Sequence, residues 1–170
     1  MYGDTIVAIA TAPGEAGIGV VRLSGPEALA IGQQLFRPTA ARCRYASHHL
    51  YHGRVADGDQ VVDEALLVHM PGPHSYTAEN VVEIQCHGGQ MPLERILHLA
   101  IQHGARLASP GEFTLRAFLN GRLDLAQAEA VADVIKAQSD ASLRLAVNQL
   151  GGRLSAAIEH ARQIVLGVLA

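Results

Sequence analysis

The stretch Val81-Val-Glu-Ile-Gln-Cys-His87 predicts a β-strand with one apolar and one polar face, because successive side chains of a strand point to opposite sides of the sheet. Glu83, Gln85 and His87 share the polar face, and the second valine, the isoleucine and the cysteine share the apolar one. A glycine pair ends the strand, and Pro92–His103 follows with apolar residues at helical spacing. This segment therefore predicts a helix packed on the apolar face of a sheet.

The sequence on either side extends the same pattern of strands and short helices. Further strands are predicted at Asp4–Ala10, Gly19–Ser24, His49–Val55 and Val61–Met70, with a helix at about residues 26–36. Asp57-Gly-Asp59 is typical of a hairpin turn between two of these strands. Strands and helices that are mixed in this way favour an α+β fold for the first two thirds of the chain.

The last third is predicted to be helical. Ser109-Pro-Gly-Glu112 matches a capping box with proline at the first helical position, so a short helix should start there and run to about Leu119. Asp124 opens an alanine-rich helical stretch to about Leu150, and another apolar helix begins near Arg153. We place the domain boundary near 118–122, which divides the chain into residues 1–118 and 119–170.

The chain stops inside that apolar helix. A single helix cannot bury the apolar side chains along its own face. We expect another chain or further sequence to cover it, and favour a truncated protein over a natural helix end.

Composition excludes several classes of protein. The chain has 170 residues with 13 basic and 16 acidic side chains, so nucleic-acid binding by its own electrostatics is disfavoured. It has no tryptophan and only 4% aromatic residues, which argues against a platform that stacks single-stranded bases. No apolar run approaches the length of a membrane span, and neither a signal-peptide plan nor a disulfide framework is visible, which favours a cytoplasmic protein.

Three charged residues are candidates for a binding site. Glu83 belongs either to a solvated strand face or to the wall of a ligand site. Arg22 lies between two apolar residues of a predicted strand, where an arginine usually pairs with a carboxylate of the protein or of a ligand. Arg122 follows the Asn120-Gly121 turn, which is either a solvated helix end or an anion site.

Other chemistries are disfavoured by residue type and spacing. The nine histidines lack the spacing of a metal site. Cys86 and His87 point to opposite faces of one strand and cannot form a nucleophile–base pair, so the cysteine is interpreted as a buried apolar residue. A phosphate-binding P-loop requires a lysine after glycine, and the only lysine, Lys136, lies within the predicted helix.

Long motifs resemble the MnmE (TrmE) family of tRNA-modification GTPases, in order along nearly the whole chain. The matching segments are Asp4–Gly14, Gly17–Gly25, Ser75-Tyr-Thr77, Glu83–Gly89 and Pro110–Ala130.

The resemblance implies an N-terminal domain similar to folate-dependent aminomethyltransferases, followed by a helical domain that carries an inserted Ras-like GTPase domain. Residues 1–118 would then be a tetrahydrofolate-binding and dimerisation domain, and residues 119–170 the first helices of the helical domain. GTP, Mg²⁺ and K⁺ would act only through the GTPase domain, which is missing here. The implied reaction modifies the wobble uridine of tRNA at C5 together with a flavoprotein, MnmG, and uses 5-formyltetrahydrofolate or a related folate. No membrane is involved.

Residue by residue, the resemblance implies that Arg22, Glu83 and Arg122 bind the folate. Arg122 stands where the family usually has lysine, and Glu15 stands where the family loop usually has arginine. Two other functions remain open: a stand-alone folate-dependent one-carbon transferase, which requires a general base near Glu83, and a non-catalytic assembly module.

Overall fold

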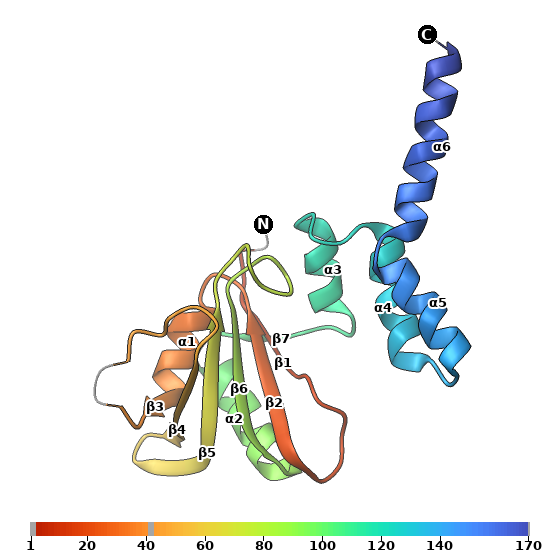
Figure 1. Cartoon of the computed structure of the whole chain (residues 1–170). Coiled ribbons are helices and arrows are strands. Elements are labelled where there is room, and N and C mark those ends of the chain that lie inside the picture. Colours follow the sequence, from red (N-terminus) through yellow and green to blue (C-terminus); the bar gives the residue numbers. More distant parts are fainter. Residues whose placement is uncertain (1–2, 41–42, 170) are drawn as a thin grey trace. The chain divides into compact units, whose positions relative to one another are not determined.

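The computed structural model describes residues 3–40 and 43–169 and divides the chain into two compact units, Met1–Phe113 and Thr114–Ala170 (Figure 1). Over the described residues it contains seven strands and six helices. The strands all lie in the first unit, so the mixed α+β class predicted for this part of the chain is confirmed. Each unit is described by itself below.

A single mixed sheet organises the first unit. Its strands are β1 (Ile6–Ile9), β2 (Ala16–Ser24), β3 (Phe36–Pro38), β4 (Leu50–Asp57), β5 (Gln60–Met70), β6 (Val81–Gly88) and β7 (Arg106–Leu107). They are ordered β3-β4-β5-β6-β2-β1-β7. All neighbouring pairs are antiparallel except β1 and β7, which run parallel. The sheet therefore places β2 and β6 side by side at its centre.

Helices α1 (Ala28–Leu35) and α2 (Gln90–Gln102) pack on one face of this sheet (Figure 1). The core between them is aliphatic and includes Leu23, Ile84 and Ile96, all fully buried. The opposite face, which we call the outer face, carries the half-buried residues Val20, Arg22, Leu66, Glu83 and Gln85. The alternation predicted for β6 is thus confirmed.

The two shortest strands were not predicted. β3 has three residues and β7 has two, which is too short for a detectable period. Phe36, predicted to lie in a helix, instead opens β3 and pairs with Val55 of β4. The close approach of β3 to β4 requires glycine at position 53, because a Cβ there would lie 2.3 Å from the carbonyl oxygen of Arg37.

Helix α3 (Glu112–Leu119) begins in the first unit and continues into the second. It starts two residues later than the Ser109-Pro pattern predicts, because Gly111 has a φ of 78°, which no right-handed helix contains. The Glu112 side chain nevertheless accepts a hydrogen bond from the Ser109 backbone N–H at 2.8 Å, as it would in a capping box.

The second unit also contains α4 (Leu125–Lys136), α5 (Asp140–Leu150) and α6 (Arg153–Leu169). Asp124 and Gln127 cap α4 reciprocally, so the helix start predicted at Asp124 is confirmed. The alanine-rich stretch to Leu150 is two helices rather than one, because Ser139 forms a second cap and starts α5. Side-chain amides join the start of α4 to the end of α5, so these two helices form an antiparallel hairpin. None of the helices in the described ranges is long and apolar enough to span a membrane.

Candidate functional site

Arg22 of β2 and Glu83 of β6 are directly opposite each other in the antiparallel register and form an ion pair on the outer face. Both Nε and Nη2 of Arg22 lie 2.7 Å from the same oxygen, Oε1 of Glu83. The second oxygen, Oε2, accepts no hydrogen bond from the described residues. The side chains are 27% and 16% exposed, so the pair is partly shielded but reachable from solvent.

Two aromatic rings lie close to the guanidinium of Arg22. Its Cζ atom lies 5.4 Å from the centre of the Tyr76 ring and 5.8 Å from the centre of the Phe113 ring. Both distances fall within the range of cation–π attraction. The rings and Glu83 together fix the position of a side chain that would otherwise have several rotamers. The outer face therefore presents a preorganised group of one cation, one carboxylate and two aromatic rings.

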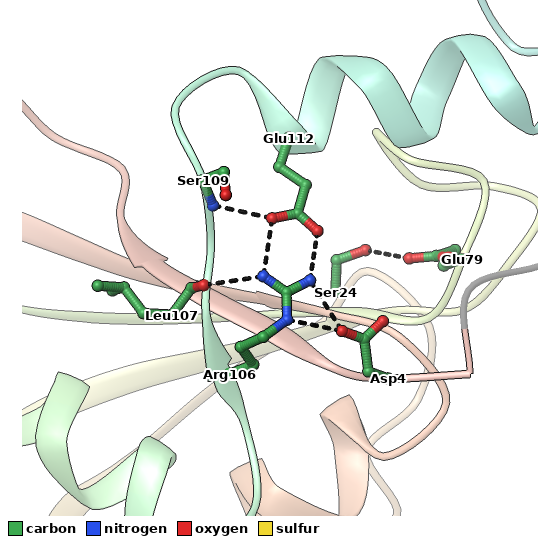
Figure 2. A network of polar contacts seen from close by, with 7 residues as sticks. All are labelled: Asp4, Ser24, Glu79, Arg106, Leu107, Ser109 and Glu112. Carbon is green, nitrogen blue, oxygen red and sulfur yellow. Dashed lines mark hydrogen bonds and ion pairs between the residues drawn. The ribbon is translucent and has the colours of Figure 1, made fainter.

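The loop that carries Tyr76 is tied to the end of β2 by buried hydrogen bonds. The Ser24 hydroxyl donates to Oε2 of Glu79 at 2.8 Å (Figure 2). Since a hydroxyl has one proton, the Thr77 hydroxyl donates to Ser24 over the 2.7 Å between their oxygens. Ser24 and Thr77 are fully buried, and Glu79 is 9% exposed. The loop on both sides of Tyr76 is thus held by a buried network in which Thr77 and Glu79 take part.

Arg122, the third predicted residue, belongs to the second unit. It is exposed in the turn after α3, where Gly121 has a φ of 73°, and its backbone N–H donates to the carbonyl of Ala117 at 2.9 Å. The structure brings Arg22 and Glu83 together; convergence of Arg122 with them stays a prediction.

The outer face continues along β6 to His87, whose side chain is 70% exposed and pairs with Asp63. The carboxylate of Asp63 accepts from the backbone N–H of His87 at 2.8 Å and contacts Nδ1 of the same residue at 2.7 Å. Hydrogen bonding to Asp63 raises the pKa of His87 above its ordinary 6.5. His87 also lines a shallow hollow of about 280 Å³, together with residues that include Ile18, Leu66 and Gln85.

Cys86 lies on the helix-covered face and is 4% exposed. Burial raises the pKa of its thiol to about 11. A neutral, buried thiol is a poor nucleophile, so the interpretation of Cys86 as a buried apolar residue is confirmed.

Glu15, the acidic residue in the first loop, lies far from the Arg22–Glu83 pair. It precedes Ala16, which pairs with Gly88 at the other end of β2. Arg22 lies six positions further along this strand, which is at most about 20 Å. Glu15 and Glu94 both line a cavity of about 590 Å³ there, so this end of the sheet disfavours an anionic ligand.

Sequence reasoning missed the two aromatic rings. Tyr76 lies in a loop of prolines and glycines, and Phe113 follows a predicted helix start, so neither belongs to an apolar period. The chain has only seven tyrosines and phenylalanines. Because aromatic residues are so few, each of them could have been singled out in the sequence as a candidate contact. An aromatic residue in a polar loop usually has a packing partner or a ligand.

Comparison with known proteins supports the assignment suggested by the motifs. A family model described as GTP-binding protein TrmE N-terminus matches residues 5–122. The tRNA modification GTPase MnmE of Chloroflexus aurantiacus is 56% identical over 168 residues, which cover 98% of this chain and 37% of that protein. The protein of the same name from Desulforamulus reducens is 51% identical over 174 residues, which cover 100% of this chain and 38% of that protein. The chain spans less than two fifths of these relatives, and it belongs to the TrmE N-terminal family.

Proposed function

We propose that this chain is the folate-binding and dimerising N-terminal part of a tRNA-modification GTPase. Residues 1–118 form the folate-binding domain, with a fold similar to folate-dependent aminomethyltransferases, and residues 119–170 supply the first helices of a helical domain. The ligand is 5-formyltetrahydrofolate or a related tetrahydrofolate. Family membership supports this proposal, and the geometry around Glu83 gives it a chemical basis.

The single observation that carries the folate proposal is the asymmetric use of the Glu83 carboxylate. Oε1 is occupied by Arg22, whereas Oε2 accepts nothing from the described residues. The Glu83 side chain is 16% exposed, so this oxygen can be reached from outside the chain. The remaining acceptor capacity is therefore available to a donor from outside the chain.

A pterin ring has the complementary donors. It offers a ring N–H and an exocyclic amino group side by side, and a carboxylate can accept from both. Glu83 lies on a central strand, which gives the rigidity that recognition requires. Arg22 would orient that carboxylate, and Arg122 would offset the negative charge of the folate tail.

The alternatives make different demands on the same residues. A stand-alone one-carbon transferase requires a general base near Glu83, but the hydrogen-bond partner of Glu83 over the described residues is a guanidinium, which does not lose its proton. A pure assembly module requires no ligand at all. Binding of folate separates this last function from the proposed one.

The remaining steps belong to the whole protein and to its partners. The relatives are named tRNA modification GTPases, so we propose that a further domain binds GTP with Mg²⁺ and K⁺. The chain alone should neither bind nor hydrolyse GTP, because its only lysine lies in α4 and forms no P-loop. With the flavoprotein MnmG, the complete protein would modify the wobble uridine of tRNA at C5 in the cytoplasm.

Titration calorimetry with 5-formyltetrahydrofolate tests the proposal. We expect saturable binding by the chain and a weaker signal from the p-aminobenzoylglutamate portion alone, because that portion lacks the donors for Glu83. Equal affinity for the complete folate and for the tail would remove Glu83 from the site. An absence of binding by either one would favour the assembly module.

A further inference from the structure

Arg106 of β7 is the centre of an ion-pair network at the start of α3 (Figure 2). Its Nη2 and Nη1 donate to the two oxygens of Glu112 at 2.6 and 3.1 Å, which is the bidentate geometry of a strong arginine–carboxylate pair. Its Nε donates to Oδ2 of Asp4 at 2.8 Å, and Nη1 also donates to the carbonyl of Leu107 at 3.0 Å. The guanidinium is therefore held from several sides.

Glu112 is the more buried member of the pair, at 7% exposed. Its Oε2 accepts from the backbone N–H of Ser109 at 2.8 Å, and its own N–H donates to the Ser109 carbonyl at 3.0 Å. β7, in turn, pairs with β1, where the N–H of Arg106 donates to the carbonyl of Thr5 at 2.8 Å. The first residue of α3 is thus fixed to the edge of the sheet by both backbone and side chain.

The next residue, Phe113, contacts the candidate site. Its ring centre lies 5.8 Å from Cζ of Arg22. Because the Glu112 backbone is fixed, the direction of the Phe113 Cα–Cβ bond is fixed as well, and a shift of the first turn of α3 would carry the ring away from Arg22. A small tilt of the α3 backbone at Glu112 produces a larger displacement at the far edge of the Phe113 ring.

We infer that the Arg106–Glu112 ion pair is a positioning device for the Arg22–Glu83 site and acts through Phe113. The inference rests on the proposed folate function. Phe113 bounds one side of the Arg22 guanidinium, and Arg22 determines which oxygen of Glu83 remains available. Release of Glu112 would loosen Phe113, then Arg22, and finally the orientation of the acceptor that faces the ligand.

A double-mutant cycle tests the proposed route. Glu112→Gln removes the charge with little change of shape, and Phe113→Leu removes the aromatic face while keeping an apolar side chain. We expect each variant to weaken 5-formyltetrahydrofolate about three- to tenfold, the range of one cation–π contact. The double variant should be no weaker than the weaker single variant, because both changes act on one contact.

Asp57→Asn is the matched control. It neutralises the carboxylate of an exposed ion pair with Arg95, in the same unit and outside this network. The control should bind folate like the wild type. Arg106→Lys repeats the test from the other partner of the ion pair, since it keeps the charge but loses the bidentate fork. This variant replaces Glu112→Gln in the experiment if Glu112→Gln does not fold.

A second readout needs no ligand. The Nε–H of Arg22 is hydrogen-bonded to Glu83, and the guanidinium lies within 6 Å of the centres of two aromatic rings, so its proton resonance should be shifted by ring currents and exchange slowly with water. Glu112→Gln should move this resonance and speed its exchange, whereas Asp57→Asn should not.

The outcomes separate this inference from the proposed function. If the wild type does not bind folate, the proposed function fails, and the Arg22 resonance alone decides about the positioning device. Unchanged affinity and an unchanged resonance in a folded Glu112→Gln variant would overturn the inference. Additive losses in the double variant would also overturn it, because Glu112 would then act by a route that does not include Phe113.

Discussion

Arg22 and Glu83 are separated by 61 positions in sequence, yet they occupy directly opposed positions on β2 and β6, with two guanidinium nitrogens on one carboxylate oxygen. This relationship has two consequences. The protein carboxylate is the partner that an arginine among apolar strand residues requires. At the same time, one oxygen of that carboxylate remains available to a ligand.

The first prediction concerns the stability contributed by this pair. Arg22→Met should lower the free energy of unfolding by about 1–3 kcal/mol, because it leaves the half-buried Glu83 carboxylate without its partner. The same change at Arg95, whose pair with Asp57 is about half exposed, should cost under about 1 kcal/mol. Urea denaturation of both variants measures the difference, and equal losses would contradict the role assigned to burial.

The second prediction concerns the dependence of stability on pH. The pKa of His87 is raised in the folded chain by the hydrogen bond to Asp63. The stabilisation is therefore fully present below the ordinary pKa of 6.5 and is lost as the pH rises through the folded pKa. Asp63→Asn should make the free energy of unfolding less dependent on pH over this range. NMR titration of the His87 ring gives the pKa directly, and a value at or below 6.5 in the wild type would refute the assignment.

The third prediction concerns the edge of the sheet. Gly53→Ala should destabilise the chain by about 1–3 kcal/mol, because the new Cβ would meet backbone atoms of β3 that cannot move aside. Gly17→Ala is the control, since nothing lies within 4 Å of a Cβ there, and it should change stability by less than about 0.5 kcal/mol. Thermal unfolding of the two variants compares them, and a tolerated alanine at position 53 would show that β3 does not pack as described.

The fourth prediction concerns self-association. We expect a homodimer formed through residues 1–118, where Ile18 and Leu50 are more than half exposed. Helix α6 offers a competing apolar surface that includes Ile158 and Ile164. Deletion of residues 153–170 should leave the dimer intact in sedimentation experiments. Loss of the dimer on deletion would assign the interface to α6, and a monomeric wild type at tens of micromolar would exclude both interfaces.

The sequence predicts the central elements well because their patterns are local. Alternation alone assigns Glu83 and Cys86 to opposite faces of β6, and Asp124 before an alanine-rich stretch identifies a helix start. The break before Ser139 was missed, because alanine-rich residues on both sides favour a continuous helix and a single serine cap is a weak signal. β3 and β7 were missed because strands of three and two residues depend on their neighbours in the sheet.

The site was predicted only in part, for a different reason. Residue type indicates that Arg22 needs a carboxylate, but not which one, because the choice depends on strand register. The positions of Tyr76 and Phe113 against Arg22 depend on a loop network and on the Arg106–Glu112 pair. Contacts of this kind join segments far apart in the chain, and no local period encodes them.

The central claim is that Glu83 recognises a tetrahydrofolate, and calorimetry with 5-formyltetrahydrofolate on the wild type and on Glu83→Gln tests it most directly. The variant keeps the size of the side chain but turns one acceptor into a donor. Glu64→Gln, which changes an exposed carboxylate paired with His52, is the control. We predict a loss of about ten- to hundredfold in affinity for Glu83→Gln, the effect of one charged hydrogen bond, with wild-type affinity in the control. Equal affinities of all three proteins would contradict the account and assign Glu83 to a solvated strand face.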